Sequence, residues 1–188
     1  MSELLPHHLQ DLHRSGLSDE TIRGLGFYSG SAAEVRAILA FDAGPGLVIP
    51  YPIYDTLELF SRVKPDSPPL IDGKLPKYLS PKGNLLQPYI PPRSWKTLRD
   101  PTSRLLITEG EKKAAKADQE GFPCIGLGGI YGFRDREHLF LPALEKVVWA
   151  GRDVVLVPDS DVGTNQNVRD AVWDVEFHRP AITHRLPK

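Results

Sequence analysis

Acidic residues at two points of the sequence could hold a divalent metal ion. Glu109 follows the apolar run 105–107, and Asp159 and Asp161 follow the apolar run 154–157. Residues i and i+2 of an extended segment face the same side, so the two aspartates point together and repel each other by about 4 kcal/mol at ~4 Å and an effective dielectric of about 20. A cation is expected to offset that repulsion, and carboxylate oxygens without nearby Cys or His favour Mg²⁺ or Mn²⁺. Glu109 would add a third ligand or a general base.

The pair Asp159 and Asp161 also has a purely structural interpretation. It can form an Asx turn in which Asp161 caps a following helix, and isolated Asp-x-Asp motifs match by chance. The sequence Glu109-Gly110-Glu111 at a second strand end favours the metal site instead. In parallel α/β sheets, ligands bind beyond the carboxyl ends of the strands.

The region that must position these acids alternates apolar strands with helical segments. This alternation predicts an α/β fold, with a mostly parallel sheet and helices on both faces. The expected strands are 105–107, 124–127, 154–157 and a last one at 182–186, and the expected helices are 111–120, 138–149 and 168–177.

Upstream of this region, the sequence predicts a small α+β subdomain. Residues 4–43 are expected to be helical, since Ser18 and the spacing of Ser31 and Glu34 mark helix N-termini. Twelve of the 18 prolines lie between Pro45 and Pro101, which excludes long helices there and favours short strands at 47–51 and 57–63, with extended pieces around residues 78 and 89. We therefore expect two domains, 1–100 and 101–188.

Charge is distributed unevenly along the chain, although the net charge is only −1. Residues 62–116 contain 12 Lys and Arg against 5 Asp and Glu, a local charge of +7, and the rest contains 11 against 19, a local charge of −8. The split indicates either a basic face for a polyanion or an ordinary solvated surface.

Several function classes are excluded by composition. The single Cys124 excludes a disulfide framework, a Cys-rich zinc ribbon and a CxxC redox pair. The apolar runs are shorter than the ~20 residues that a membrane span needs, and the first residues do not form a signal peptide. We expect a soluble, cytoplasmic protein without a membrane partner. His7, His8 and His13 lack a typical metal-ligand spacing and are interpreted as surface or core histidines.

The motifs together resemble a known family. The segments LLITEGEKK at 105–113 and GRDVVLVPDSDV at 151–162 resemble the Toprim fold of bacterial-type primases, type IA and II topoisomerases, OLD-family nucleases and ribosomal-RNA maturases. The chain resembles most closely a Toprim-like family of unknown function from plasmid, phage and mobile-element replication proteins. The supporting segments are SGLSDETI, GLVIPY, SRVKPDSPP, KLPKYLSPKGN, TEGEKKA and DSDVGTNQNVRDA.

The resemblance implies a site made of two sets of residues. Glu109, Asp159 and Asp161 would hold Mg²⁺ or Mn²⁺, with Lys113 beside them in a catalytic role. The upstream subdomain would present cations to template and nucleotide, with Arg62 and Lys77 as the best candidates and Lys64, Lys82 and Lys112 as further ones. Arginine can grip a phosphate bidentately, whereas lysine acts as a point charge. The alternative for all of these cations is ordinary solvent-facing charge, and the sequence does not decide which of Lys112 and Lys113 points toward the acids.

The implied function is that of a DNA primase. Such an enzyme makes primers on single-stranded DNA from nucleoside triphosphates by two-metal phosphoryl transfer, together with a replicative helicase or another replication chain. A Toprim nuclease and a catalytically silent nucleic-acid-binding module remain alternatives. The family also implies a further acidic run after the last strand. The sequence stops at Lys188 about where that run would begin, so we expect either a shortened chain or one metal ligand fewer.

Overall fold

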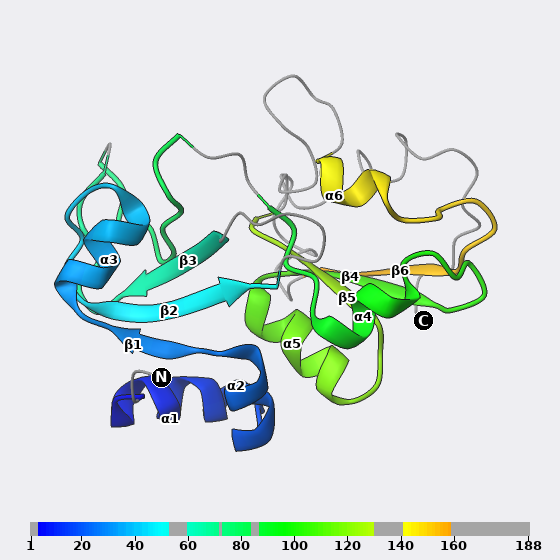
Figure 1. Ribbon diagram of the computed structural model, residues 1–188, viewed down its shortest axis with the longest axis horizontal. Helices are drawn as coiled ribbons and strands as arrows, with labels where there is room; N and C mark the ends of the chain where they lie inside the picture. The colour runs from blue at the N-terminus through cyan, green and yellow to red at the C-terminus, as the bar shows by residue number, and fades with distance from the viewer. Residues whose placement is uncertain (1–3, 53–59, 72, 84–86, 130–140, 159–188) are drawn as a thin grey trace. The chain divides into compact units, whose positions relative to one another are not determined.

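The computed structural model describes residues 4–52, 60–71, 73–83, 87–129 and 141–158, which belong to two compact units (Figure 1). The first unit spans Met1–Leu85 and the second spans Leu86–Lys188. This boundary lies earlier than residue 100, where the sequence analysis placed it. Tyr89 shows why: its side chain is fully buried, and its backbone exchanges two hydrogen bonds, of 2.7 and 2.8 Å, with the backbone of Gly126 in the second unit.

The first unit contains a three-stranded antiparallel sheet in the order β1-β2-β3. The predicted helix starts are confirmed, because the Ser18 hydroxyl accepts a hydrogen bond from the Thr21 N–H, and Ser31 and Glu34 form a capping box. The sequence analysis missed β1, a strand of three residues that pairs with β2. The elements are α1 (Pro6–Arg14), α2 (Asp19–Leu25), β1 (Tyr28–Gly30), α3 (Ala32–Leu39), β2 (Gly46–Tyr51) and β3 (Phe60–Pro65).

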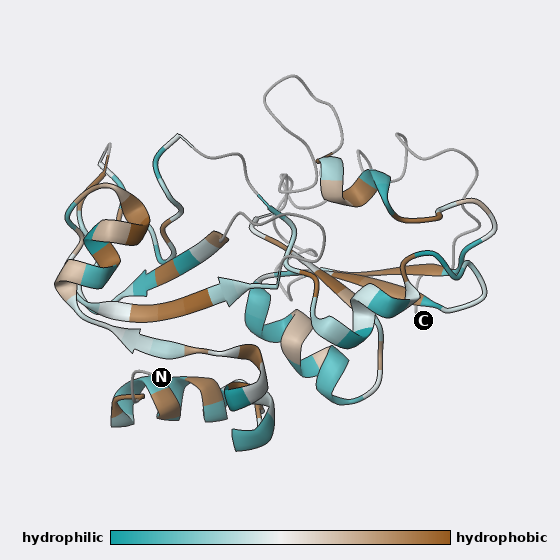
Figure 2. Ribbon diagram, viewed as in Figure 1, coloured by the Kyte–Doolittle hydropathy of each residue, from teal (hydrophilic) through white to brown (hydrophobic). Residues whose placement is uncertain are grey.

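Helices cover both faces of this sheet. Val35 and Leu39 of α3 pack on the face that carries Val48 and Val63, and all four side chains are fully buried. α1 crosses the other face, where it contacts side chains of β1 and β3. Figure 2 shows the hydrophobic middle of β2 between these two layers. The alternation of side chains along each strand thus supplies two apolar surfaces from one short sheet.

The second unit confirms the predicted α/β fold with a parallel sheet. Among the described residues its three strands run in the order β5-β4-β6, all parallel, so β4 is central. α5 and α6 lie on opposite faces of the sheet (Figure 1). The predicted helix 168–177 and last strand 182–186 lie outside the described residues. The elements are α4 (Pro92–Thr97), β4 (Leu105–Glu109), α5 (Glu111–Gln119), β5 (Cys124–Leu127), α6 (Pro142–Glu145) and β6 (Val154–Val157).

The helix predicted at 138–149 is shorter in the structure. Within residues 141–158 it covers only Pro142–Glu145. The Val148 N–H donates to the carbonyl of Leu98 instead of the carbonyl of Leu144, and the Trp149 indole N–H donates to that Leu144 carbonyl at 3.0 Å. The helix therefore ends because a tertiary contact and a side chain take the bonds that would have continued it.

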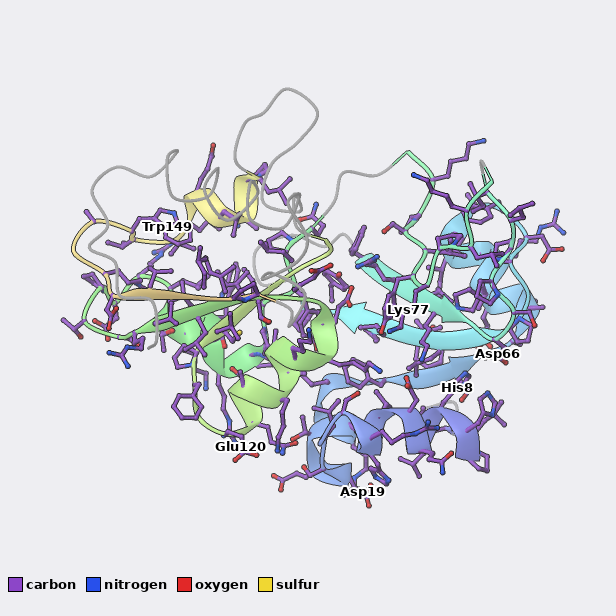
Figure 3. The ribbon with its side chains drawn as sticks, turned by 180° about the vertical axis from the view of Figure 1, so that it is seen from behind. His8, Asp19, Asp66, Lys77, Glu120 and Trp149 are labelled. Carbon is purple, nitrogen blue, oxygen red and sulfur yellow. The ribbon has the colours of Figure 1, made fainter. Side chains whose placement is uncertain are left out.

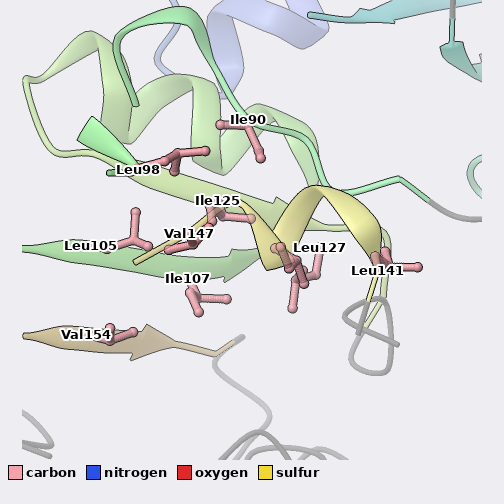
Figure 4. Close-up of a cluster of buried hydrophobic side chains, with 10 residues drawn as sticks. Ile90, Leu98, Leu105, Ile107, Ile125, Leu127, Leu141, Val147 and Val154 are labelled. Carbon is pink, nitrogen blue, oxygen red and sulfur yellow. The ribbon is translucent and has the colours of Figure 1, made fainter. Parts of the chain in front are cut away.

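A hydrophobic cluster fixes the strands of the second unit (Figure 4). Alternate residues of β4 and β5 point into it, together with residues from the segments that flank α4 and α6. Its members are Ile90, Leu98, Leu105, Ile107, Ile125, Leu127, Leu141, Leu144, Val147 and Val154, all of them buried. Within the described residues, every helix is too short or too polar to span a lipid bilayer.

A buried polar cluster joins α4, α5 and β5. The Asp118 carboxylate accepts hydrogen bonds from the Ser94 N–H at 2.7 Å and from the Ser94 hydroxyl at 2.5 Å. The same hydroxyl oxygen accepts the Cys124 N–H at 2.8 Å. The Asp118 carboxylate, the Ser94 N–H and hydroxyl, and the Cys124 N–H thus each have a hydrogen-bond partner, as buried polar groups in folded proteins normally do. The cluster holds α5 against β5, and α5 begins directly after the turn that follows Glu109.

Burial makes the Cys124 thiol a source of pH-dependent stability. Desolvation, with a smaller effect from the nearby Asp118 carboxylate, raises the pKa of Cys124 to about 12. In the unfolded chain a thiol deprotonates near pH 8.5, so between these values the unfolded state binds fewer protons and stability falls as pH rises, by at most about 1.4 kcal/mol per pH unit.

Urea unfolding at pH 7.5 and pH 10.5 tests this effect. All three tryptophans (Trp95, Trp149 and Trp173) lie in the second unit, so their fluorescence reports on its unfolding. The wild-type chain is expected to lose about 2 kcal/mol more than Cys124→Ala between the two pH values. Equal losses in both proteins would contradict the burial argument.

Candidate functional site

Glu109 is the last residue of the central strand, at its carboxyl end, and its side chain is partly exposed. The next residue, Gly110, has φ 88° and ψ 154°, a conformation that only glycine adopts readily. The Gly110 N–H donates to the Leu127 carbonyl at 2.8 Å. A Cβ on Gly126 would lie 2.7 Å from the Gly110 carbonyl oxygen. The turn after Glu109 therefore needs glycine at positions 110 and 126, and it presents Glu109 at the carboxyl ends of the strands.

The carboxyl ends of β4 and β6 lie side by side. The parallel register pairs Ile107 with Leu156 and Thr108 with Val157. The buried Thr108 hydroxyl also donates to the Val157 carbonyl at 3.0 Å, which fixes the two ends together. Sequence reasoning missed this role of Thr108, which only the strand order reveals. Asp159 and Asp161 follow β6 in the sequence but lie outside the described residues.

Arg152 fixes the opposite end of β6. Its side chain is fully buried and donates hydrogen bonds to the backbone carbonyls of Thr97, Leu98 and Asp100, at the end of α4. Burial lowers the pKa of Arg152, and the Asp100 carboxylate acts in the opposite sense. Arg152 thus connects the residue pair before β6 to the end of α4 and to the segment between α4 and β4.

α5 begins immediately after Gly110 and carries both predicted lysines. Lys113 is exposed and Lys112 is partly buried, and both make interactions in the structure. Glu111, the first residue of the helix, is only 1% exposed. A carboxylate in the first helical turn is favourable because it faces the positive end of the helix dipole, and it offsets the two lysines. Lys112 and Lys113 therefore lie in the first turn of α5, three and four residues after Glu109 in the sequence.

In the first unit, Arg62 and Lys77 meet at one aromatic ring. The Arg62 guanidinium carbon lies 5.3 Å from the centre of the Tyr78 ring, and the Lys77 ammonium nitrogen lies 5.8 Å from it. The segment around Leu79 pairs antiparallel with Val63, which brings Tyr78 alongside β3. Sequence reasoning named the two cations but missed Tyr78, whose position beside Lys77 was the available signal. Both cations are thus within the range of cation–π attraction to the same ring.

The other two cations that the sequence analysis named in the first unit, Lys64 and Lys82, have different surroundings. The Lys64 ammonium forms an ion pair of 3.0 Å with the carboxylate of Asp11 on α1. Lys82 is exposed, and its backbone N–H donates to the Leu39 carbonyl. Arg62 and Lys64 lie two residues apart on β3 and so share one face of the sheet. The structure therefore groups Arg62, Lys64 and Lys77 along β3 and its neighbouring segment.

The family described as a domain of unknown function (DUF3854) matches residues 94–178, slightly less than half of the chain. This match includes Glu109 and both aspartates of the predicted metal site. No curated protein matches the sequence.

Solved primase structures are similar in fold. A DnaG catalytic core matches with a TM-score of 0.59 and 16% identity over 88% of this chain. The Aquifex aeolicus primase, with its zinc-binding and RNA polymerase domains, gives 0.57 and 12% over 89%, and the E. coli primase catalytic core gives 0.53 and 17% over 89%. The chain covers 57%, 45% and 58% of those three chains, respectively, so it spans about half of their length. It shares the mixed α/β fold of primase catalytic cores.

Proposed function

We propose that this chain is the catalytic core of a DNA primase-type nucleotidyltransferase, which makes primers on single-stranded DNA by metal-dependent phosphoryl transfer. The observation that carries the proposal is the meeting of the carboxyl ends of β4 and β6 at one sheet edge. Glu109 ends the first of these strands, and the sequence Asp159-Ser160-Asp161 follows the second. Acidic residues after two neighbouring parallel strands support a metal site with oxygen ligands at the carboxyl ends of those strands.

The residues of the second unit would hold metal and nucleotide. We assign Glu109, Asp159 and Asp161 as ligands of Mg²⁺ or Mn²⁺, a choice that fits their carboxylate oxygens and the partial exposure of Glu109. The bound ions would lower the pKa of the attacking 3′-hydroxyl and stabilise the leaving pyrophosphate. Lys113 would neutralise charge on the transferring phosphate, and Lys112 would contact the nucleotide.

The residues of the first unit would contact phosphates of template or nucleotide. Arg62 and Lys77 are the first choice, because the Tyr78 ring holds both cations on one side of β3. Lys64 would have to exchange its Asp11 partner for a phosphate, and the exposed Lys82 remains a further candidate. The proposed partners are single-stranded DNA, nucleoside triphosphates and a helicase or other replication chain of a plasmid, phage or mobile element.

Labelled single-stranded DNA, incubated with the protein and Mg²⁺ or Mn²⁺, tests the proposal. With nucleoside triphosphates present, we expect new strands to appear, and without them we expect the DNA to stay intact. Cleavage without nucleotides would identify a nuclease that uses the same acids. Metal-independent binding with neither synthesis nor cleavage, steeply weakened by salt, would identify a silent binding module.

A further inference from the structure

A second group of metal-binding side chains lies in the first unit. His7 and His8 lie in the first turn of α1, and Asp66 directly follows β3. His8 and Asp66 are 58 positions apart in the sequence. The His8 Nε2 atom lies 2.7 Å from Asp66 Oδ1, and the His7 Nε2 atom lies 3.5 Å from the same oxygen. One ligand atom from each side chain lies within 4.8 Å of the other two. Figure 3 labels His8 and Asp66, which lie together at the end of α1.

We propose that His7, His8 and Asp66 bind a first-row transition-metal dication, with Zn²⁺ as the ion that best fits two imidazoles and one carboxylate. This donor set differs from the all-oxygen set proposed around Glu109, and its residues belong to the other unit. The inference therefore does not depend on the proposed function. Three protein ligands leave at least one coordination position for water or an exogenous ligand.

The distances fit an ion after a small adjustment. Zn²⁺ lies about 2.0–2.1 Å from each ligand atom, so ligand atoms of a tetrahedral site are about 3.3 Å apart. The two measured separations from Asp66 Oδ1, 2.7 and 3.5 Å, lie on either side of that value. The His7 and His8 ring centres are 4.1 Å apart. Rotation of the exposed His7 side chain and a slight retreat of Asp66 would bring all three atoms into the coordination shell.

Ser29 of β1 already orients the buried ring. The His8 side chain is 6% exposed, and its Nδ1 atom lies 2.7 Å from the Ser29 hydroxyl oxygen. That oxygen also accepts the Leu5 N–H at 2.7 Å. In the metal-bound form, His8 Nδ1–H would donate to Ser29, which leaves Nε2 as the coordinating atom. Metal-bound histidines commonly have such a partner on the second nitrogen, because it fixes the tautomer and the ring orientation.

A purely structural role is the competing explanation. The His8 Nε2–H can donate directly to Asp66, and the positive end of the helix dipole at His7 and His8 disfavours a cation. The His7 imidazole argues against this explanation, because a hydrogen bond between His8 and Asp66 does not require a second imidazole. The nearby Lys64 and Asp11 are paired with each other and so contribute little net charge.

The chain also offers a control for the experiment: His13 and Asp19 form a similar pair, with one imidazole only, at 2.7 Å.

Zn²⁺ binding to the full chain tests the proposal, measured by competition with a chromophoric chelator at pH 7.5. The wild type and His13→Asn are each expected to bind one more equivalent of Zn²⁺ per chain than His7→Asn does. His7 is 58% exposed, so its substitution should not alter the melting temperature without metal. Zn²⁺ should raise the melting temperature of the wild type and of His13→Asn by several degrees, and that rise should disappear in His7→Asn.

Two further variants separate coordination from hydrogen bonding. In Asp66→Asn the amide oxygen can still accept from His8, so the metal-free fold should survive while Zn²⁺ affinity falls at least tenfold. Ser29→Ala should weaken Zn²⁺ binding about 10- to 100-fold through the lost orientation of His8. Equal Zn²⁺ stoichiometry and affinity in the wild type, His7→Asn and Asp66→Asn would overturn the proposal.

Discussion

Glu109→Gln is expected to reduce metal-dependent primer synthesis by at least about a hundredfold, the range seen when one charge-stabilising group is removed from an active site. The substitution removes an anionic oxygen from the sheet edge at the end of β4 but keeps the size of the side chain. Glu109 is partly exposed, and the turn after it is fixed by the backbone of Gly110 and Leu127. The fold should therefore persist, and urea unfolding followed by tryptophan fluorescence should be unchanged.

Glu120→Gln is the matched control for this experiment. Glu120 lies just beyond the other end of α5, is exposed and pairs with Lys116. It carries the same charge as Glu109 but lies away from the sheet edge where the strands end. Its variant should synthesise primers at the wild-type rate. Full synthesis by Glu109→Gln would remove Glu109 from the metal site and with it the main support for the proposed function.

Asp118→Ala should destabilise the second unit by about 3 kcal/mol, because it removes the acceptor of two buried hydrogen bonds from Ser94 and leaves both donors without a partner. Asp118 is only 7% exposed and Ser94 is fully buried, so water cannot easily replace the lost bonds. With a urea m-value of about 2 kcal/mol/M, the unfolding midpoint should fall by about 1.5 M.

Further variants assign the effect to the hydrogen bonds. Asp118→Asn keeps an acceptor oxygen and should cost clearly less than Asp118→Ala. In the double variant Asp118→Ala with Ser94→Ala, the second substitution removes one of the donors that Asp118→Ala leaves unpaired. The double variant should therefore lose less stability than the sum of the losses in the two single variants. Glu120→Ala, at the exposed position just beyond the C-terminal end of α5, should leave the midpoint unchanged. A midpoint for Asp118→Ala close to that of Glu120→Ala would show that the buried cluster contributes little.

Features that depend on neighbouring residues could be predicted from residue types alone. Ser18 and the pair Ser31 and Glu34 begin helices through hydrogen bonds that span three residues. The apolar runs of β4, β5 and β6 predicted buried parallel strands. These signals are reliable because local geometry and side-chain burial follow directly from residue type.

Contacts between residues far apart in the sequence are visible only in the folded chain. α6 ends at Glu145, and the Val148 N–H donates to the Leu98 carbonyl instead of continuing the helix. Residues 87–100 belong to the second unit, with contacts such as that of Tyr89 with Gly126. His8 was interpreted as an ordinary surface or core histidine, yet its ring contacts Asp66, which directly follows β3.

Such pairings bring together residues separated by long loops, and many alternative partners have the same chemistry. Their selection depends on strand order and on packing of the whole core, which no local pattern contains. Thr108 illustrates the difference: its type and position were visible in the sequence, but its bond to Val157 required β6 to lie beside β4.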